Sequence, residues 1–193
     1  MLQHGSFIGD EELLNGERKK IEVRNPYNHD LIGEIFCATK EEVILAVEKA
    51  HEVFQNTMKN MPAYQRSKIL QKATILLEEQ SEVFARLLVK EAGKPIVEAR
   101  GEVMRAIQVL QFAAEGAKNL NGEQIVLDNA IGGESQLDFS KRVPIGVIAA
   151  ITPFNFPLNL VLHKVAPAIA TGNTIVLKPA KKLLFHPLHY LSC

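Results

Sequence analysis

Residues 142–180 read RVPIGVIAAITPFNFPLNLVLHKVAPAIATGNTIVLKPA. Within them a short and almost wholly apolar run, 145–151, precedes a polar turn, and a second such run covers 174–177. Short apolar runs of this kind are typical of parallel strands that are covered on both faces. The segment 158–171 between them is long enough for a crossover helix and is followed by Gly172, a helix-stop residue. This order predicts a right-handed β-α-β unit and hence an α/β fold.

The turn between the first strand and the helix runs from Thr152 to Asn155. In an open parallel sheet, ligands bind beyond the carboxyl ends of the strands, where such turns lie. Prolines at positions 144, 153 and 157 restrict the backbone there, so Asn155 should be held in one orientation. Its amide N–H can stabilise charge developing on a carbonyl oxygen, which typically lowers a barrier by about 2.7 to 4 kcal/mol. The residue alone, however, favours a simpler interpretation, a cap of the following helix.

The region before this unit alternates between short strands and amphipathic helices. Apolar runs separated by turn residues predict small antiparallel strands within residues 6–36. Thr39, followed three residues later by Glu42, has the capping-box pattern at the start of a helix that should end near Lys59.

Three further helices are predicted from the spacing of apolar residues. The first has Pro62 in its opening turn, where a helix tolerates proline best. The second begins at Ser81 and ends at Gly93, and the third follows Pro95 and ends near Asn119. We expect these helices to form a scaffold.

An extended hairpin or arm is predicted next. Residues 122–128 and 135–143 alternate between apolar and polar side chains around a turn at 129–133. Such alternation around a turn is typical of two antiparallel strands.

The composition indicates a small globular protein that acts on small molecules. The 193 residues, 47% of them hydrophobic, suffice for one sizeable core. Lys plus Arg equal Asp plus Glu at 22 each, which argues against a nucleic-acid or anionic-membrane partner. No targeting pattern is apparent in residues 1–10, and polar residues and prolines interrupt 143–176, so no membrane span is expected. Cys37 and Cys193 form neither a disulfide framework nor a metal-ligand pattern, so a cytoplasmic protein without a metal is expected.

The turn motif TPFNFP at 152–157 resembles that of NAD(P)-dependent aldehyde dehydrogenases, which usually have Trp where this chain has Phe154. A weaker resemblance extends upstream to about Phe7. It implies the N-terminal part of the aldehyde dehydrogenase fold, a Rossmann-like parallel sheet with helices plus a β-hairpin association arm. The other matching positions are His163-Lys164, Ala166–Ala168, Gly172-Asn173 and Lys178–Ala180, with Asn25-Pro26 and Glu91–Pro95 upstream.

The resemblance also divides the chain. Residues 1–120 would form the N-terminal strands and the helical part of the cofactor-binding domain, and 121–143 the association arm. Residues 144–180 would form the β-α-β unit for cofactor and oxyanion, followed by an atypical tail at 181–193. Because the arm serves subunit association in this family, the full-length form is expected to be a homo-oligomer, a dimer or tetramer.

The implied reaction is oxidation of an aldehyde to a carboxylic acid, through a thiohemiacetal on cysteine, hydride transfer to NAD or NADP, and thioester hydrolysis. Asn155 matches the family's oxyanion donor. Lys164 matches a lysine near the catalytic region, and a partly buried structural ion pair is the alternative. Its neighbour His163 is expected to be a buried core residue. Lactaldehyde is slightly favoured as substrate, while glyceraldehyde 3-phosphate and semialdehydes remain open.

The implied cofactor contacts lie at the ends of the two strands. Lys178 matches the lysine that reaches the adenosine ribose, with an exposed strand-end lysine as the alternative. Where the family commonly has a ribose-binding glutamate, this chain has Lys181, which would attract the 2'-phosphate of NADP. The predicted cofactor-binding residues are Ile151, Thr152, Pro153, Phe154, Asn155, Lys178, Pro179, Ala180 and Lys181.

The resemblance fades after Lys182, and this predicts an incomplete and inactive N-terminal fragment whose tail comes from a frameshift or a fragmentary gene model. Nothing around Cys193 resembles the segment of the family's nucleophile. His186, His189 and Cys193 lack a fourth ligand and are not expected to bind a metal. The alternative from another class is a non-catalytic module that binds a nucleotide or pairs with a full-length subunit through residues 122–143.

Overall fold

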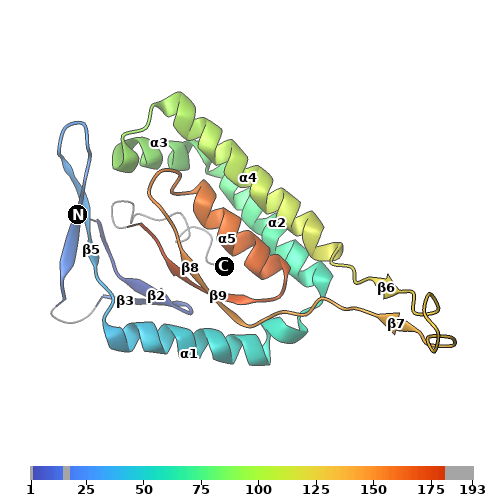
Figure 1. Cartoon of the computed structure of the whole chain (residues 1–193). Helices are drawn as coiled ribbons and strands as arrows, with labels where there is room; N and C mark the ends of the chain where they lie inside the picture. Colours follow the sequence, from blue (N-terminus) through green and yellow to red (C-terminus); the bar gives the residue numbers. More distant parts are fainter. Residues whose placement is uncertain (1, 15–17, 181–193) are drawn as a thin grey trace.

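The chain forms a layer of helices beside several small sheets in the part that the computed structural model describes, residues 2–14 and 18–180 (Figure 1). The N-terminal half contains β1 (Leu2–His4), β2 (Ser6–Ile8), β3 (Glu11–Leu13), β4 (Lys20–Arg24), β5 (Leu31–Phe36), α1 (Lys40–Asn56), η1 (Met58–Asn60), α2 (Ala63–Glu79) and α3 (Ser81–Ala92). The remainder contains α4 (Ile96–Lys118), β6 (Gln124–Ile125), β7 (Asp138–Phe139), β8 (Val147–Ile151), α5 (Asn159–Ala170) and β9 (Thr174–Lys178).

The predicted β-α-β unit is confirmed. β8 and β9 are parallel neighbours, with Val147 opposite Thr174 and Ile151 opposite Lys178. The helix between them is α5, one residue shorter at each end than the predicted segment. Gly172 follows it at a φ of +82°, a conformation that glycine adopts without steric cost.

Asn173 fixes the start of β8 from the turn after α5. Its side-chain Oδ1 accepts hydrogen bonds from the backbone N–H groups of Ile145 and Gly146, at 2.7 and 2.9 Å. One side chain therefore sets where the first strand begins, although 27 or more residues separate the partners along the chain.

The predicted complete burial of this strand is wrong at both ends. Ile145 and Ile151 are 83% and 66% exposed, whereas Ala150 is buried. Both α1 and α5 contact β8 and β9, so coverage of the two-stranded sheet is partial. Two strands do not provide enough surface for every apolar side chain of the run to find a neighbour within the described residues.

The helical layer contains the main core. α4 packs against α2, α3 and α5, which confirms the scaffold role expected of these helices (Figure 1). Gly93 ends α3 in the left-handed conformation at the predicted position, and Pro62 precedes α2 as its N-cap. Fully buried side chains of this core are Leu70, Leu77, Phe84, Val103, Leu110, Leu158 and Leu162.

The N-terminal strands form two small sheets. β2 pairs with β3 and β4 with β5 in antiparallel fashion, as predicted. β1, which the sequence analysis did not predict, adds to β5 in parallel and gives a sheet with the order β1-β5-β4.

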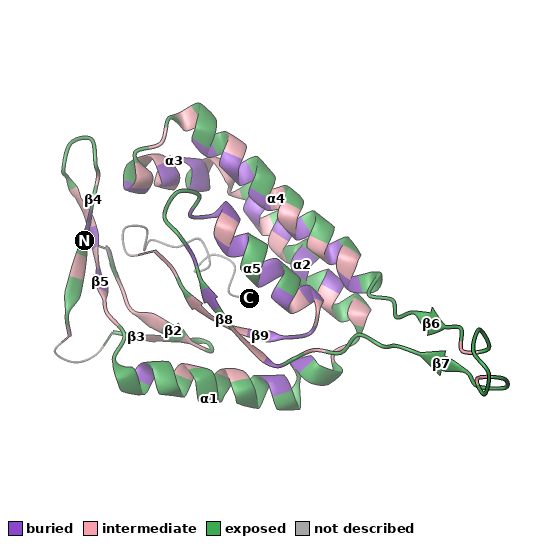
Figure 2. Cartoon of the chain, in the orientation of Figure 1, coloured by how far each residue is buried: buried purple, intermediate pink, exposed green. Residues whose placement is uncertain are grey.

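The hairpin arm is present but shorter than predicted. β6 and β7 pair over only two residues each, with Gln124 opposite Phe139 and Ile125 opposite Asp138. The arm extends beyond the end of α4 and its strands are exposed throughout (Figures 1 and 2). Among the described residues no other strand pairs with β6 or β7, so the ladder has no neighbour that would extend it. Within the described ranges, no helix is long and apolar enough to cross a membrane.

The capping box of α1 is confirmed. The Thr39 hydroxyl accepts the backbone N–H of Glu42 at 3.2 Å, and the Glu42 carboxylate accepts the backbone N–H of Thr39 at 3.0 Å. Arg18 adds an ion pair to the same carboxylate at 2.6 Å. The helix ends at Asn56, three residues earlier than expected, because a 3-10 turn follows it.

We expect Thr39→Ala to lower the free energy of unfolding by about 1 kcal/mol, because it leaves a helix N–H without its acceptor. Urea unfolding followed by circular dichroism measures this difference. Thr57→Ala is the matched control, since Thr57 flanks the same helix and makes no side-chain cap bond. Equal losses in the two variants would contradict the role of the cap.

Candidate functional site

The turn that carries Asn155 is anchored to the end of β9. The backbone N–H of Thr152 donates to the carbonyl oxygen of Lys178 at 3.2 Å. Since Ile151 is opposite Lys178, the turn 152–155 and the segment Lys178–Ala180 leave the sheet at the same edge. Residues 151–155 and 178–180 of the predicted cofactor site are therefore brought together, whereas Lys181 lies outside the described residues.

The side chains at this edge differ in exposure. Thr152 is buried, while Ile151, Pro153, Phe154 and Asn155 are exposed. Lys178 is also exposed, and Pro179 and Ala180 are half-buried. The site is thus an open edge with one amide and one ammonium group presented to solvent.

The other end of the turn is held by a buried carboxylate of α4. Glu102 is only 1% exposed, and its Oε1 accepts the backbone N–H groups of Leu158 and Asn159 at 2.9 and 3.1 Å. Its Oε2 pairs with the Lys94 ammonium at 2.5 Å. A buried charge is tolerated when it is paired and hydrogen-bonded in this way.

Lys94 also contacts the turn directly. Its ammonium lies 4.0 Å from the centre of the Phe156 ring, and the Arg105 guanidinium lies 6.0 Å from the same ring. Both distances are within the range of cation–π attraction. The ring of Phe156 is therefore tied to the helical layer by the same lysine that neutralises Glu102.

The backbone N–H groups at the start of helix α5 already have acceptors at three successive positions. Leu158 and Asn159 donate to Glu102, and Leu160 donates to the carbonyl oxygen of Phe156 at 2.9 Å. In many dinucleotide-binding folds the pyrophosphate occupies this position. Here the Glu102 carboxylate accepts two of these N–H groups, those of Leu158 and Asn159.

Asn155 does not cap the helix. Within the described residues its side chain makes no hydrogen bond, and the N-cap of α5 is Leu158, without a side-chain cap. The simpler interpretation of Asn155 is therefore wrong, because Glu102 performs the capping. The amide of Asn155 is left available for an external oxygen.

A surface hollow lies elsewhere, between α1 and the start of β8, and none of the predicted site residues lines it. Its lining consists of Val47, Glu48, His51, Phe54, Gln55, Ile145, Gly146 and Val147. The predicted site is thus defined by strand-end groups and not by this hollow.

Comparisons with known proteins agree on one family. Residues 13–190 match the model of the aldehyde dehydrogenase family. The chain belongs to that family. It is 45% identical over 179 residues to 3-sulfolactaldehyde dehydrogenase of Priestia aryabhattai, covering 93% of this chain and 36% of that protein. It is 42% identical over 165 residues to lactaldehyde dehydrogenase of Methanocaldococcus jannaschii, covering 86% of this chain and 34% of that protein.

A solved structure supports the same assignment. Aldehyde dehydrogenase 21 of Physcomitrella patens, in complex with succinate, has a TM-score of 0.91 and 38% identity, over 98% of this chain and 39% of that one. The chain thus spans a little over a third of these aldehyde dehydrogenases. The family match runs to residue 190, and the atypical tail at 181–193 stays a prediction, because it lies outside the described residues.

Two residues of α5 are more exposed than predicted. His163 is exposed, so its assignment to the core is wrong. Lys164 is exposed as well, and among the described residues it makes no ion pair, which contradicts the buried-pair alternative. Both belong to the outer stripe of the helix, with Pro167 one turn further on, whereas Val161, Leu162 and Val165 point inward.

Neither Glu102 nor the role of Lys94 was predicted from the sequence. One signal was available: Glu102 lies among Ala99, Val103 and Ala106, which form the buried face of α4. A charged residue on an apolar face requires a partner, and its position could have been noted. The identity of that partner depends on contacts across 56 residues.

A second buried carboxylate, Glu91 of α3, has no such partner. Its Oε1 makes no hydrogen bond within the described residues. Burial raises the pKa of Glu91 from its usual 4.5 to about 9, so the carboxyl is neutral at pH 7.

Between pH 4.5 and about 9, the folded state therefore keeps a proton that the unfolded state has already released. The stability that this proton confers is complete below the unfolded pKa and is lost as the pH rises through the folded pKa. We expect Glu91→Gln, which does not titrate, to gain stability relative to wild type from pH 5 to pH 9. Urea unfolding at each pH measures the difference, with Glu82→Gln as control, because Glu82 is only half-buried and is paired with Arg86 and Arg100. Parallel pH profiles for wild type and Glu91→Gln would contradict the assignment.

Proposed function

We propose that the chain provides the cofactor-side and oxyanion half of an NAD(P)-dependent aldehyde dehydrogenase. One observation carries the proposal: Thr152 is bonded to Lys178, so the free amide of Asn155 and the ammonium of Lys178 occur at the same sheet edge. An amide N–H is suited to a developing oxyanion and an ammonium to a ribose or phosphate oxygen.

In the proposed reaction an aldehyde is oxidised to a carboxylic acid, and the nicotinamide, when bound, accepts the hydride. Asn155 would donate to the aldehyde oxygen as negative charge develops on it. Lys164 would lie toward the reacting groups, and residues 151–154 with 178–181 would contact the cofactor. Lactaldehyde-like substrates are favoured, because the curated relatives include lactaldehyde and 3-sulfolactaldehyde dehydrogenases.

NADP is the favoured cofactor within this proposal. Lys178 would reach the adenosine ribose, and Lys181, where the family commonly has glutamate, would attract the 2'-phosphate of NADP. Solved relatives include a glyceraldehyde-3-phosphate dehydrogenase of Methanocaldococcus jannaschii with NADP and a protein, PnpE, with nicotinamide adenine dinucleotide. A cytoplasmic location is part of the same proposal and is supported by the free thiol of Cys37.

We expect Lys178→Ala to weaken NADP binding about tenfold, the size of one lost charge-assisted contact. Isothermal titration calorimetry of the purified chain measures the affinity. Lys72→Ala, an exposed lysine on α2, is the control for a general change in charge. Equal affinities of wild type and Lys178→Ala would remove Lys178 from the site.

Turnover tests the proposed reaction itself. The chain mixed with NAD or NADP and a panel of aldehydes should give no reduced nicotinamide. A hybrid in which it replaces the matching part of the Priestia aryabhattai relative should be active. In that hybrid, Asn155→Ala should lower kcat by about 10² to 10³-fold, and Asn56→Ala, on the exposed end of α1, should not. Unchanged kcat in Asn155→Ala would exclude the oxyanion role.

A non-catalytic association module is the second candidate. The arm exposes Ile125, Leu137 and Phe139, and an exposed apolar hairpin favours contact with another subunit. Co-sedimentation with an intact relative would support an association module, and it would equally support the homo-oligomer expected of the full-length form. Independent sedimentation would count against both.

A further inference from the structure

The buried carboxylate of Glu102 does more than cap the start of helix α5. We propose that Glu102 is a positioning residue for Asn155, acting through the backbone of residues 156–160 and through Lys94. What Asn155 does chemically rests on the proposed function, but the positioning does not.

The turn is held at two points, and Asn155 lies between them. On one side Thr152 is bonded to Lys178 of β9. On the other, Glu102 binds the backbone of Leu158 and Asn159. Only a short free segment separates these anchors, so its conformational freedom is small and little entropy is left to lose when a ligand binds.

The ring of Phe156 adds a side-chain contact to the second anchor, which Glu102 makes. Lys94 pairs with Glu102 and also lies over the Phe156 ring at 4.0 Å. Loss of the carboxylate would therefore release two backbone N–H groups and the cation that holds the ring. The first effect acts on Leu158 and Asn159, within the segment that follows Asn155, and the second acts on Phe156, the residue next to it.

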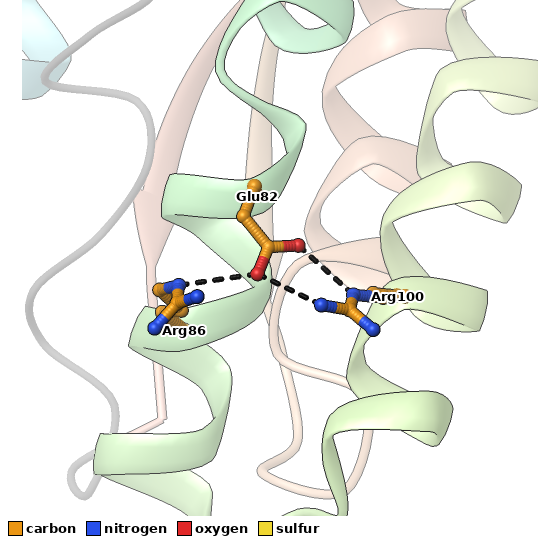
Figure 3. A network of polar contacts seen from close by, with 3 residues as sticks. All are labelled: Glu82, Arg86 and Arg100. Atoms are coloured by element: carbon orange, nitrogen blue, oxygen red, sulfur yellow. Dashed lines mark hydrogen bonds and ion pairs between the residues drawn. The ribbon is translucent and has the colours of Figure 1, made fainter.

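The chain offers a matched control in Glu82. This carboxylate pairs with Arg86 of its own helix, α3, at 3.1 Å, and joins α3 to α4 through Arg100 at 2.9 Å (Figure 3). Hydrogen bonding from Arg100 lowers the pKa of Glu82, so it is ionised at neutral pH. It bridges the same scaffold, but its hydrogen bonds go to Arg86 and Arg100 and not to residues 152–160. A purely structural carboxylate would behave like Glu82.

The test uses nuclear magnetic resonance on the purified chain without nucleotide. In Glu102→Ala we expect the backbone order parameter of Asn155 to fall from about 0.85 to about 0.6 or below. In Glu102→Gln, which keeps one acceptor oxygen and loses the charge, we expect partial rescue of that order. We also expect the Leu158 and Asn159 amides of Glu102→Gln to exchange on the order of tenfold faster. Glu82→Gln should change neither quantity.

Three results would overturn the proposal: unchanged order at Asn155 in Glu102→Ala, a loss of order spread evenly over α2, α4 and α5, or equal changes in Glu82→Gln. If Glu102→Ala does not fold, amide exchange in Glu102→Gln decides, and unchanged exchange overturns it. If the wild type binds no NADP but Glu102 variants loosen Asn155 selectively, the positioning role stands and the proposed function fails.

Discussion

A single buried ion pair, Glu102 with Lys94, connects the helical layer to the sheet edge. Desolvating a carboxylate costs several kcal/mol, and the pair is tolerated because two backbone N–H groups and one ammonium compensate it. Removing one partner of such a pair typically costs about 3 to 5 kcal/mol, since the other charge is left buried. The positions of α4, of the first turn of α5 and of Phe156 are consequently coupled.

This coupling determines where a ligand can be held. A helix that begins directly after a parallel strand normally offers its N-terminal amides to a phosphate. In this chain Glu102 accepts two of those amides, from Leu158 and Asn159, and its negative charge lies at the positive end of the helix dipole. Among the described residues, the Asn155 amide and the Lys178 ammonium are exposed at this edge, and they suit a carbonyl oxygen and a sugar or phosphate oxygen.

The sequence predicted the local features of the fold and of the site well. The capping box at Thr39, the stop at Gly93 and the β8-α5-β9 order depend on residues close together in the chain, whose preferences can be read directly. The second anchor could not be read, because Glu102 and Leu158 are 56 residues apart and no periodicity specifies their contact. For the same reason Asn155 could be a cap or a free donor until Glu102 was seen to take the cap position.

Errors in predicted burial have a different origin. Apolar spacing shows which side chains are suited to burial, and the elements that pack around them determine which are buried. Ile145 and Ile151 have the character of a covered strand but are exposed, because β8 has one strand neighbour and partial cover from α1 and α5. His163 is a polar residue in an apolar stretch, and it was expected to be buried. It is exposed because Val161, Leu162 and Val165 fill the inward face of α5. The spacing of apolar residues therefore predicts which side chains are buried only when the elements that pack around the strand or helix are known.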